Sequence, residues 1–426
     1  MERRPLGLIA AAALWLSLVP FAPCVVAEPG DSEKSPQSPS ASALDALRDY
    51  LRQPRADRAA ITDQPFATTP LSSEHAAAAA RLLWQDHAKF IAEDRKDGFE
   101  ANKFELGEHT LKFLARKFGN RPDRGYDLFI SLHGGGGAPA RVNDQQWQNQ
   151  IRIYEADQGI IIAPRAPTDA WNMWFQPHID GLFDRLIETF VALGIVNPNR
   201  VYLMGYSAGG DGVYQMAPRM ADRWAAAAMM AGHPNDASPL NLRNIGFTIH
   251  VGENDGAFDR NAVARQWGEK LDTLRKQDPD GYRYKTVIHE GKGHWMDGQD
   301  AEALAWMKQF TRDPLPEVVA WRQGRNLMPA LYWLAVNVAD VEPGDTIRAR
   351  RDGQRITLQT DKPFRMRVRL NDKMLDLDQP IQITGEGYQP FRGKVRRTIA
   401  MLATSLQQRG DPASLFAAEV EMQPAT

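Results

Sequence analysis

The sequence has little cysteine, no excess of charge of either sign and no apolar run long enough to span a membrane. One cysteine among 426 residues excludes a disulfide framework and a zinc site built from cysteines. Lys plus Arg total 51 and Asp plus Glu total 53, so the formal net charge is −2. That balance excludes the strongly basic surface that attracts nucleic acid or anionic membranes. At 43% hydrophobic residues, the composition is that of a soluble protein with an ordinary core.

The first residues have the pattern of a targeting segment. After a positively charged start, Leu6–Val19 form an apolar stretch of 14 residues, whereas a membrane-spanning helix needs about 20. Val25-Val26-Ala27 places aliphatic or small residues where signal peptidase cleaves. We therefore expect residues 1–27 to be a signal peptide and the protein to be exported, to the periplasm or the extracellular space. A retained anchor or a lipid on Cys24 is the alternative.

The remaining chain divides into four segments by composition and pattern. Residues 28–41 are rich in proline and serine and are expected to be a disordered linker. Residues 42–98 form an N-terminal helical segment in this interpretation. Strands and helices alternate over 99–318, which we expect to be the catalytic domain, and 319–426 are expected to be a C-terminal β-rich domain.

Short apolar runs within the third segment predict strands that are buried on both faces. Strands of this kind occur in a mostly parallel sheet that helices flank, so the fold class is predicted to be α/β. The C-terminal segment alternates apolar with polar residues, as half-buried antiparallel strands of a small β-sandwich do. The expected strands are 127–132, 159–163, 201–204, 225–230, 247–251 and 284–289, then 346–350, 355–359, 365–369, 380–383 and 416–420, with helices over 42–57, 74–95 and 395–408.

A serine flanked by small residues marks the first candidate site. The sequence Gly205-Tyr206-Ser207-Ala208-Gly209-Gly210 follows an expected strand and precedes an expected helix. A nucleophile on so sharp a turn needs glycines nearby, because the backbone is strained and its neighbours are crowded. The N–H groups at the start of the following helix would face a forming negative charge. We assign Ser207 as a nucleophile, and a merely structural turn is the alternative.

A second glycine-rich segment, His133–Gly137, ends an earlier expected strand. Glycines there let backbone N–H groups approach a tetrahedral oxyanion closely. We expect either Gly134 or Gly135, together with the N–H of Ala208, to form an oxyanion hole. A flexible surface loop is the alternative interpretation.

Two later loops offer an acid and a base. Asp255 follows an expected strand, where a carboxylate could orient a histidine and stabilise its charged form, although Glu253 and Asp259 compete for the role. His294 lies in a glycine-bearing loop after another strand and could accept the serine proton. The predicted catalytic triad is therefore Ser207, Asp255 and His294.

Aromatic and polar residues near these motifs are the candidate substrate contacts. Trp171 and Trp174 follow a strand at the carboxyl edge of the sheet, where ligands bind such folds, and helix-to-sheet packing is the alternative for both. His133 and Tyr206, which flank the glycines and the serine, are further candidates. Asn143 is predicted either to line the same pocket or to cap a helix.

The order Ser, Asp, His along the chain, with a His-Gly-Gly loop upstream, resembles the α/β-hydrolase superfamily over about residues 105–313. Within it, the sequence is similar to exported bacterial esterases related to polyhydroxybutyrate depolymerases and feruloyl esterases. The residues that carry this resemblance are His133–Gly137, Ala170–Phe175 and Asn199–Leu203. The resemblance implies an α/β-hydrolase fold and ester hydrolysis through an acyl-enzyme. The serine motif, with its additional glycine Gly210, is also similar to that of prolyl-oligopeptidase-like serine peptidases.

The expected function is cleavage of a small or polymeric carboxylic ester by a serine hydrolase that needs no metal and no organic cofactor. A prolyl-oligopeptidase-like peptidase is one alternative. A catalytically inert hydrolase fold that binds a partner in the cell envelope is the other. No nucleic acid and no membrane is expected as a partner after signal cleavage, and the sequence does not indicate the oligomeric state.

Overall fold

The computed structural model of the chain describes residues 38–425. The expected signal peptide and most of the expected linker lie outside the described residues. The last three linker residues are not disordered as we expected, because helix α1 (Pro39–Arg52) begins there. Proline fits the first turn of a helix, where its missing N–H has no acceptor to lose. The Ser40 hydroxyl is also hydrogen-bonded to the His75 ring at 2.7 Å, which ties this turn to the next long helix.

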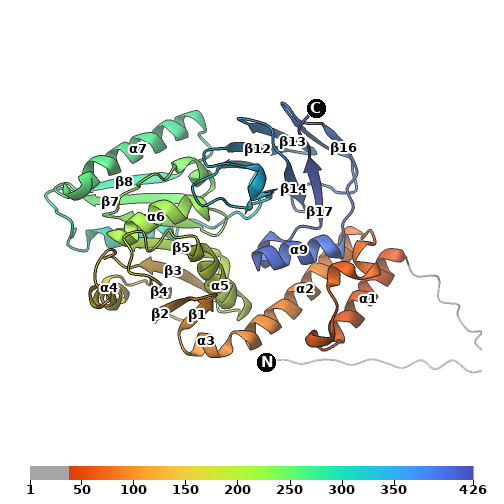
Figure 1. The fold of residues 1–426 in the computed structure, drawn as a ribbon, viewed down its shortest axis with the longest axis horizontal. Helices are drawn as coiled ribbons and strands as arrows, with labels where there is room; N and C mark the ends of the chain where they lie inside the picture. The colour runs from red at the N-terminus through yellow and green to blue at the C-terminus, as the bar shows by residue number, and fades with distance from the viewer. Residues whose placement is uncertain (1–37, 426) are drawn as a thin grey trace, which may run out of the picture. The chain divides into compact units, whose positions relative to one another are not determined.

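An eight-stranded sheet forms the centre of the α/β part, with the strand order β1-β2-β4-β3-β5-β6-β7-β8 (Figure 1). Strands β3 to β8 run parallel to one another, and β1 and β2 pair antiparallel at one edge. The bounds are β1 Lys103–Leu106, β2 His109–Phe118, β3 Tyr126–Leu132, β4 Gly159–Arg165, β5 Val196–Tyr206, β6 Ala226–Met230, β7 Gly246–Gly252 and β8 Tyr284–His289.

The six apolar runs of the sequence are the six parallel strands, and every residue of β3, β6 and β7 is buried. Strand β5 is longer than the run that predicted it and includes Asn197-Pro198-Asn199. The proline lies where the register between β3 and β5 shifts, between Tyr126 and Leu128. The N–H of Asn199 is satisfied by the Asn197 side chain at 2.9 Å. A proline is tolerated at such an irregularity because no regular ladder bond is lost.

Helices cover both faces of this sheet. Leu128 and Ile130 of β3 share a core with helices α5, α6 and α7, whereas Phe129 between them points to a second core with α4 and α8. This alternation is the period of two that places successive strand residues on opposite faces. The helix bounds are α4 Ala140–Ile153, α5 His178–Ala192, α6 Ala208–Arg219, α7 Arg260–Gln277 and α8 Glu302–Met307.

The N-terminal helices pack against a helix from the other end of the chain. Helix α2 (Ser73–Asp94), which precedes the short α3 (Lys96–Glu100), lies beside α9 (Ile399–Arg409) in Figure 1. Leu47, Leu83 and Leu402 belong to one buried apolar cluster, so α1, α2 and α9 share a core of their own. The expected helices 74–95 and 395–408 are confirmed, with bounds that shift by up to four residues.

Two smaller sheets make up the β-rich region. One has the order β10-β11-β14-β17 and the other β16-β15-β13-β12-β9. Strands β13 and β15 pair in parallel, which differs from the wholly antiparallel arrangement that we expected, because β14 between them crosses to the other sheet. The bounds are β9 Val318–Arg322, β10 Ala330–Leu331, β11 Leu334–Val336, β12 Thr346–Asp352, β13 Arg355–Thr360, β14 Met366–Leu370, β15 Ile381–Gly385, β16 Phe391–Gly393 and β17 Ala418–Met422.

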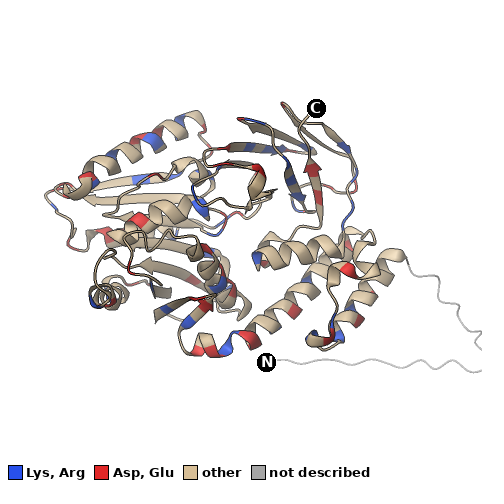
Figure 2. Ribbon diagram, in the orientation of Figure 1, with Lys and Arg blue, Asp and Glu red and all other residues tan. Residues whose placement is uncertain are grey.

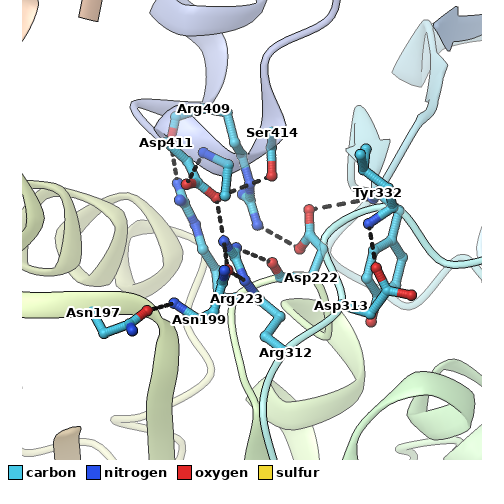
Figure 3. A network of polar contacts seen from close by, with 12 residues as sticks. Asn197, Asn199, Asp222, Arg223, Arg312, Asp313, Tyr332, Arg409, Asp411 and Ser414 are labelled. Atoms are coloured by element: carbon cyan, nitrogen blue, oxygen red, sulfur yellow. Dashed lines mark hydrogen bonds and ion pairs between the residues drawn. The ribbon is translucent and has the colours of Figure 1, made fainter. Parts of the chain in front are cut away.

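Buried ion pairs join the β-rich region to the α/β part (Figure 3). Arg312 binds Asp411 at 2.7 Å and also donates to the main-chain oxygen of Asp222 at 2.7 Å. Arg223 donates to the main-chain oxygen of Arg409 at 2.6 Å. Although burial opposes it, the two neighbouring guanidinium groups of Arg312 and Arg223 hold the pKa of the Asp411 carboxyl below its ordinary value. Residues from Pro39 onward form one compact unit, and the domain boundaries at 98 and 318 stay predictions.

Acidic and basic side chains are interspersed along the helices. Helix α7, for example, carries both signs (Figure 2), as the near-zero net charge suggests. No helix among residues 38–425 combines the length and the apolar character that crossing a bilayer requires.

Candidate active site

Ser207 lies at a sharp turn between strand β5 and helix α6. Its backbone has φ 58° and ψ −122°, a conformation that residues other than glycine rarely adopt. Its N–H donates to the Met230 oxygen at 2.9 Å, which fixes the turn against β6. The neighbouring glycines are needed for close approach, because a Cβ atom on Gly209 would lie 2.2 Å from the Leu132 oxygen and one on Gly205 would lie 2.3 Å from the Gly209 oxygen. The strand, turn and helix that the sequence predicted are present.

A continuous chain of hydrogen bonds links three loops at the carboxyl edge of the sheet. The Ser207 Oγ lies 3.0 Å from His294 Nε2, and His294 Nδ1 lies 2.8 Å from Asp255 Oδ2. A carboxylate only accepts, so Nδ1 carries the proton and Nε2 is free to accept from the serine hydroxyl. Asp255 is buried and the imidazole is partly exposed, so the histidine faces both the buried acid and the solvent.

The two competing acids have other partners. Glu253 accepts a hydrogen bond from the N–H of Gly291 at 2.9 Å. Asp259 is exposed and precedes helix α7 in a left-handed conformation. Asp255 is therefore the carboxylate that contacts His294. Its other oxygen lies 3.7 Å from Arg260 Nη1, a neighbour that the sequence did not suggest.

Tyr206 packs against the loop that carries His294 and holds it by a hydrogen bond. Its hydroxyl donates to the main-chain oxygen of His294 at 2.7 Å, and its ring lies 5.3 Å from the imidazole. Burial raises the pKa of the Tyr206 phenol, so it stays a neutral donor. The prediction of a substrate contact is corrected here, because the residue is buried and its polar atom is already used.

The glycine loop comes close to the serine turn. A Cβ atom on Gly134 would lie 3.1 Å from the Ser207 Cβ. The N–H groups of Gly136 and Gly137 are engaged, by Asn143 Oδ1 at 2.9 Å and by the Asp169 oxygen at 2.8 Å. For the N–H groups of Gly134 and Gly135, we find no acceptor among the described residues. Both remain candidates for an oxyanion donor, together with Ala208 at the start of α6, whose N–H has no intrahelical acceptor.

Asn143 fixes the shape of this loop. It is fully buried, and its amide donates to the Ala138 oxygen at 3.1 Å and to Asp169 Oδ1 at 2.8 Å while its oxygen accepts from Gly136. We expected Asn143 either to line the pocket or to cap a helix, and it does neither. Helix α4 begins after Pro139, so Asn143 lies inside the helix. A side chain on Gly135 would collide with Asn143 Oδ1 at 2.2 Å, which explains the second glycine.

His133 and Trp174 were expected to contact substrate, and both are 0% exposed. The Nε2 of His133 accepts from the Ala166 N–H at 3.1 Å and its Nδ1 contacts the Gly134 oxygen at 2.6 Å. Burial lowers the pKa of His133 to about 4, so the ring is neutral. Trp174 donates from Nε1 to the His133 oxygen at 2.9 Å. Both side chains are buried supports of the glycine loop, so the assignment of substrate contacts is wrong for them.

Trp171 is the expected contact that is accessible, with 62% of its surface exposed. Its Cβ lies 3.6 Å from the Cβ position of Gly137, beside the glycine loop. Two exposed aromatic side chains near the triad were missed: Trp295 (50% exposed) next to His294, and Phe258 (76% exposed), three residues after Asp255. Their positions within three residues of the candidate catalytic residues were the signal that could have identified them.

A cleft of about 590 Å³ opens beside Trp171. Its lining includes residues 322–326 and 328 of the β-rich region, which the sequence did not connect with the site. Among the residues that the structure describes, no cluster of three or more His, Cys, Asp or Glu side chains could hold a metal ion.

The architecture identifies the fold. The strand order β1-β2-β4-β3-β5-β6-β7-β8, with a serine on the turn after β5, an acid after β7 and a histidine after β8, is the arrangement expected from the resemblance. The chain has an α/β-hydrolase fold. This expectation about the fold class is confirmed, with a β-rich region added at the C-terminal side.

Comparisons with known proteins find similarity among solved structures. No family model matches the sequence, and no curated protein is similar to it at a significant level. Among solved structures, it is similar to a thermostable esterase, with 18% identity and a TM-score of 0.38 over 49% of this chain and 62% of that chain. It is also similar to the BES protein from Bacillus cereus, with 13% identity and a TM-score of 0.36 over 48% of this chain and 93% of that chain.

A third similar structure is the feruloyl esterase module from Clostridium thermocellum complexed with sinapinate, with 14% identity and a TM-score of 0.35 over 49% of this chain and 86% of that chain. Each likeness covers about half of this α/β-hydrolase-fold chain. With TM-scores below 0.5, these likenesses carry no argument about the substrate or the fold.

Proposed function

We propose that this protein is a serine hydrolase that cleaves carboxylic esters through an acyl-enzyme. The observation that carries the proposal is the unbroken hydrogen-bond chain from Asp255 through His294 to Ser207. It lies next to a glycine loop in which two N–H groups have no acceptor among residues 38–425. A nucleophile, a base oriented by an acid and nearby donors for an oxyanion are the parts that acyl transfer needs.

In the proposed mechanism, Ser207 Oγ attacks the carbonyl carbon of the ester while His294 Nε2 takes the hydroxyl proton. The N–H groups of Ala208 and of Gly134 or Gly135 bind the oxyanion that forms. The bond to the alcohol oxygen then breaks, and the imidazolium gives its proton to this leaving group. Asp255 stabilises the positive charge in the meantime. Water attacks the acyl-enzyme in the same way, and collapse of the second intermediate releases the acid and returns the proton to Ser207.

The peptidase alternative rested on Gly210, and the structure offers a packing reason for that residue. A Cβ atom on Gly210 would lie 2.5 Å from the Met230 oxygen, so the glycine lets α6 lie close to the end of β6. Ester substrates therefore remain the preferred proposal. The same proposal includes a polymeric ester as the natural substrate, because the sequence resembles polyhydroxybutyrate depolymerases.

The proposal is tested by labelling the mature protein with a fluorophosphonate and by measuring turnover of 4-nitrophenyl acetate and butyrate against dipeptide 4-nitroanilides. We expect labelling and ester turnover, both of which Ser207→Ala abolishes, whereas Ser73→Ala in helix α2 leaves them unchanged. Faster cleavage of the anilides would favour the peptidase. Absence of labelling and of turnover in the folded wild type would favour an inert fold.

Export from the cytoplasm is part of the proposal. It is supported by the pattern of residues 1–27 in the sequence. N-terminal sequencing of the exported protein should begin at Glu28, and a chain that stays in the cytoplasm with its N-terminus intact would contradict this.

A further inference from the structure

The cleft beside Trp171 has walls from two distant parts of the sequence. Residues 171–172 and 175–177, the C-terminal part of helix α6 and the loop at 235–238 form one wall, and residues 322–326 and 328 with 343–344 of the β-rich region form the other. Its volume of about 590 Å³ is within the range of sites that enclose small organic molecules.

The wall from the β-rich region is fixed in place. The Asn241 side chain accepts from the Arg322 N–H at 2.6 Å and donates to the Arg322 oxygen at 3.1 Å, which clamps the end of β9 onto the α/β part. A few residues later, Asn326 donates to the Phe175 oxygen at 3.0 Å. These main-chain contacts on both sides make the cleft a built feature.

The cleft begins close to the candidate nucleophile. A Cβ atom on Gly136 would lie 3.2 Å from the Trp171 oxygen and 3.5 Å from the Ala208 Cβ. Trp171, which lines the cleft, is therefore one residue away from the turn that carries Ser207. The cleft therefore opens on the glycine-loop side of the turn that carries Ser207.

The charges in the lining are neutralised with one exception. Arg219 binds both oxygens of Asp180 at 2.6 Å, and Arg325 pairs with Asp236 at 2.5 Å. For Arg322, no carboxylate lies within ion-pair distance among the residues that the structure describes. Its side chain is exposed to the cleft, and its Nη2 lies 3.5 Å from the Cβ position of Gly344, an ordinary contact distance.

We propose that this cleft binds a carboxylate-bearing part of the ester substrate and that Arg322 is the residue that selects it. The inference rests on the proposed function. A guanidinium presents a planar fork that matches a carboxylate in a bidentate way. The exposed ring of Trp171 offers an apolar surface to the carbon atoms between the ester and the acid. In this view, the β-rich region contributes to substrate choice.

Two matched pairs of esters test the proposal, because the cleft could take either side of the ester bond. On the acyl side, turnover of the 4-nitrophenyl monoester of glutaric acid is compared with that of 4-nitrophenyl hexanoate. On the alcohol side, 4-(acetoxymethyl)benzoate is compared with 4-methylbenzyl acetate. We expect kcat/KM to favour the acidic member of one pair, and the preference to shrink as salt screens the charge.

Two arginines of the β-rich region serve as variant and control. Arg322→Gln should lower the preference by about fivefold or more, the range of one charge-assisted hydrogen bond that is partly screened. Arg350→Gln, which removes an exposed cation of strand β12 outside the cleft lining, should leave the preference unchanged. Arg322→Lys, which keeps the charge, should retain part of the preference and covers the case in which the glutamine variant does not fold.

The outcomes separate the two proposals. If the wild type hydrolyses no ester, the proposed function fails. If it hydrolyses both members of each pair equally, or if both glutamine variants reduce the preference to the same extent, the proposed function stands and the role of Arg322 is overturned.

Discussion

The hydroxyl of Tyr206 donates a hydrogen bond to the main-chain oxygen of His294 at 2.7 Å. The residue that precedes the candidate nucleophile therefore holds the loop of the candidate base. This hydrogen bond links strand β5 to the loop that carries His294. The position of the imidazole therefore depends on a tyrosine that is itself buried.

Replacing this tyrosine tests the link. Tyr206→Phe keeps the ring and removes the donor, so we expect kcat to fall about fivefold, as loss of one ordinary hydrogen bond predicts, with little change in KM. Steady-state turnover of 4-nitrophenyl butyrate measures both constants. Tyr202→Phe in the same strand, whose hydroxyl donates to the distant Phe310 oxygen, is the control. Equal effects of the two variants would contradict a specific role of Tyr206.

Substitutions of Trp171 and Trp174 are predicted to affect different properties, KM and stability respectively. Trp174→Phe leaves the buried His133 oxygen without its donor, so the free energy of unfolding should fall by about 1–3 kcal/mol. Trp171→Ala removes an exposed ring, so stability should change by no more than about 0.5 kcal/mol while KM rises. Urea unfolding and ester turnover measure the two effects. A stability loss at Trp171 equal to that at Trp174 would show that both rings are structural.

These two tryptophans show what the sequence could predict of the site. Both follow strand β4 and both are aromatic, so sequence position alone gave them the same interpretation. Packing separates them, because Trp174 points into the core between the sheet and α5 and Trp171 does not. His133 is a similar case, since its place before the glycines suggested the site and its burial decides against a contact.

Most of the parallel strands were predictable because they are short, largely apolar runs, although β8 also carries Lys285, Thr286 and His289 and is only half-buried. Strands β1 and β2 were missed because they lie at the edge of the sheet and carry exposed charged residues, so they lack such a run. The cleft wall around Arg322 was missed for another reason. Its contact with Asn241 joins residues 81 positions apart, and no local pattern encodes such a contact.

Buried neutral histidines predict how stability depends on pH. Burial, and next the neighbouring His289 and Lys285, lower the pKa of His250 to about 3, whereas an unfolded histidine has a pKa of about 6.5. The stability that this residue contributes is therefore present above about 6.5 and is lost progressively as the pH falls toward the folded value, because the unfolded chain takes up the proton first.

The comparison with a variant isolates this contribution. His250→Gln has no group that titrates in this range, so the slope of the unfolding free energy against pH should decrease by up to about 1.4 kcal/mol per pH unit, the value for one proton. Urea titrations at a series of pH values between the two pKa values measure the slope. A slope that does not change would mean that His250 is already protonated in the folded protein.

The ion pair of Arg312 and Asp411 is predicted to hold the β-rich region on the α/β part. Their side chains are 1% and 3% exposed, so removing Arg312 leaves a buried carboxylate without its ion-pair partner. We expect Arg312→Met to lower the free energy of unfolding by about 3–5 kcal/mol. Arg52→Met, which breaks the exposed pair with Asp49, should cost no more than about 1 kcal/mol. Thermal unfolding followed by circular dichroism distinguishes the two variants.

If the cleft needs its second wall, Arg312→Met should also reduce the preference for acidic esters at temperatures where the rest of the protein remains folded. A variant that unfolds at the wild-type temperature would show that the apolar core, and not this ion pair, joins the two regions.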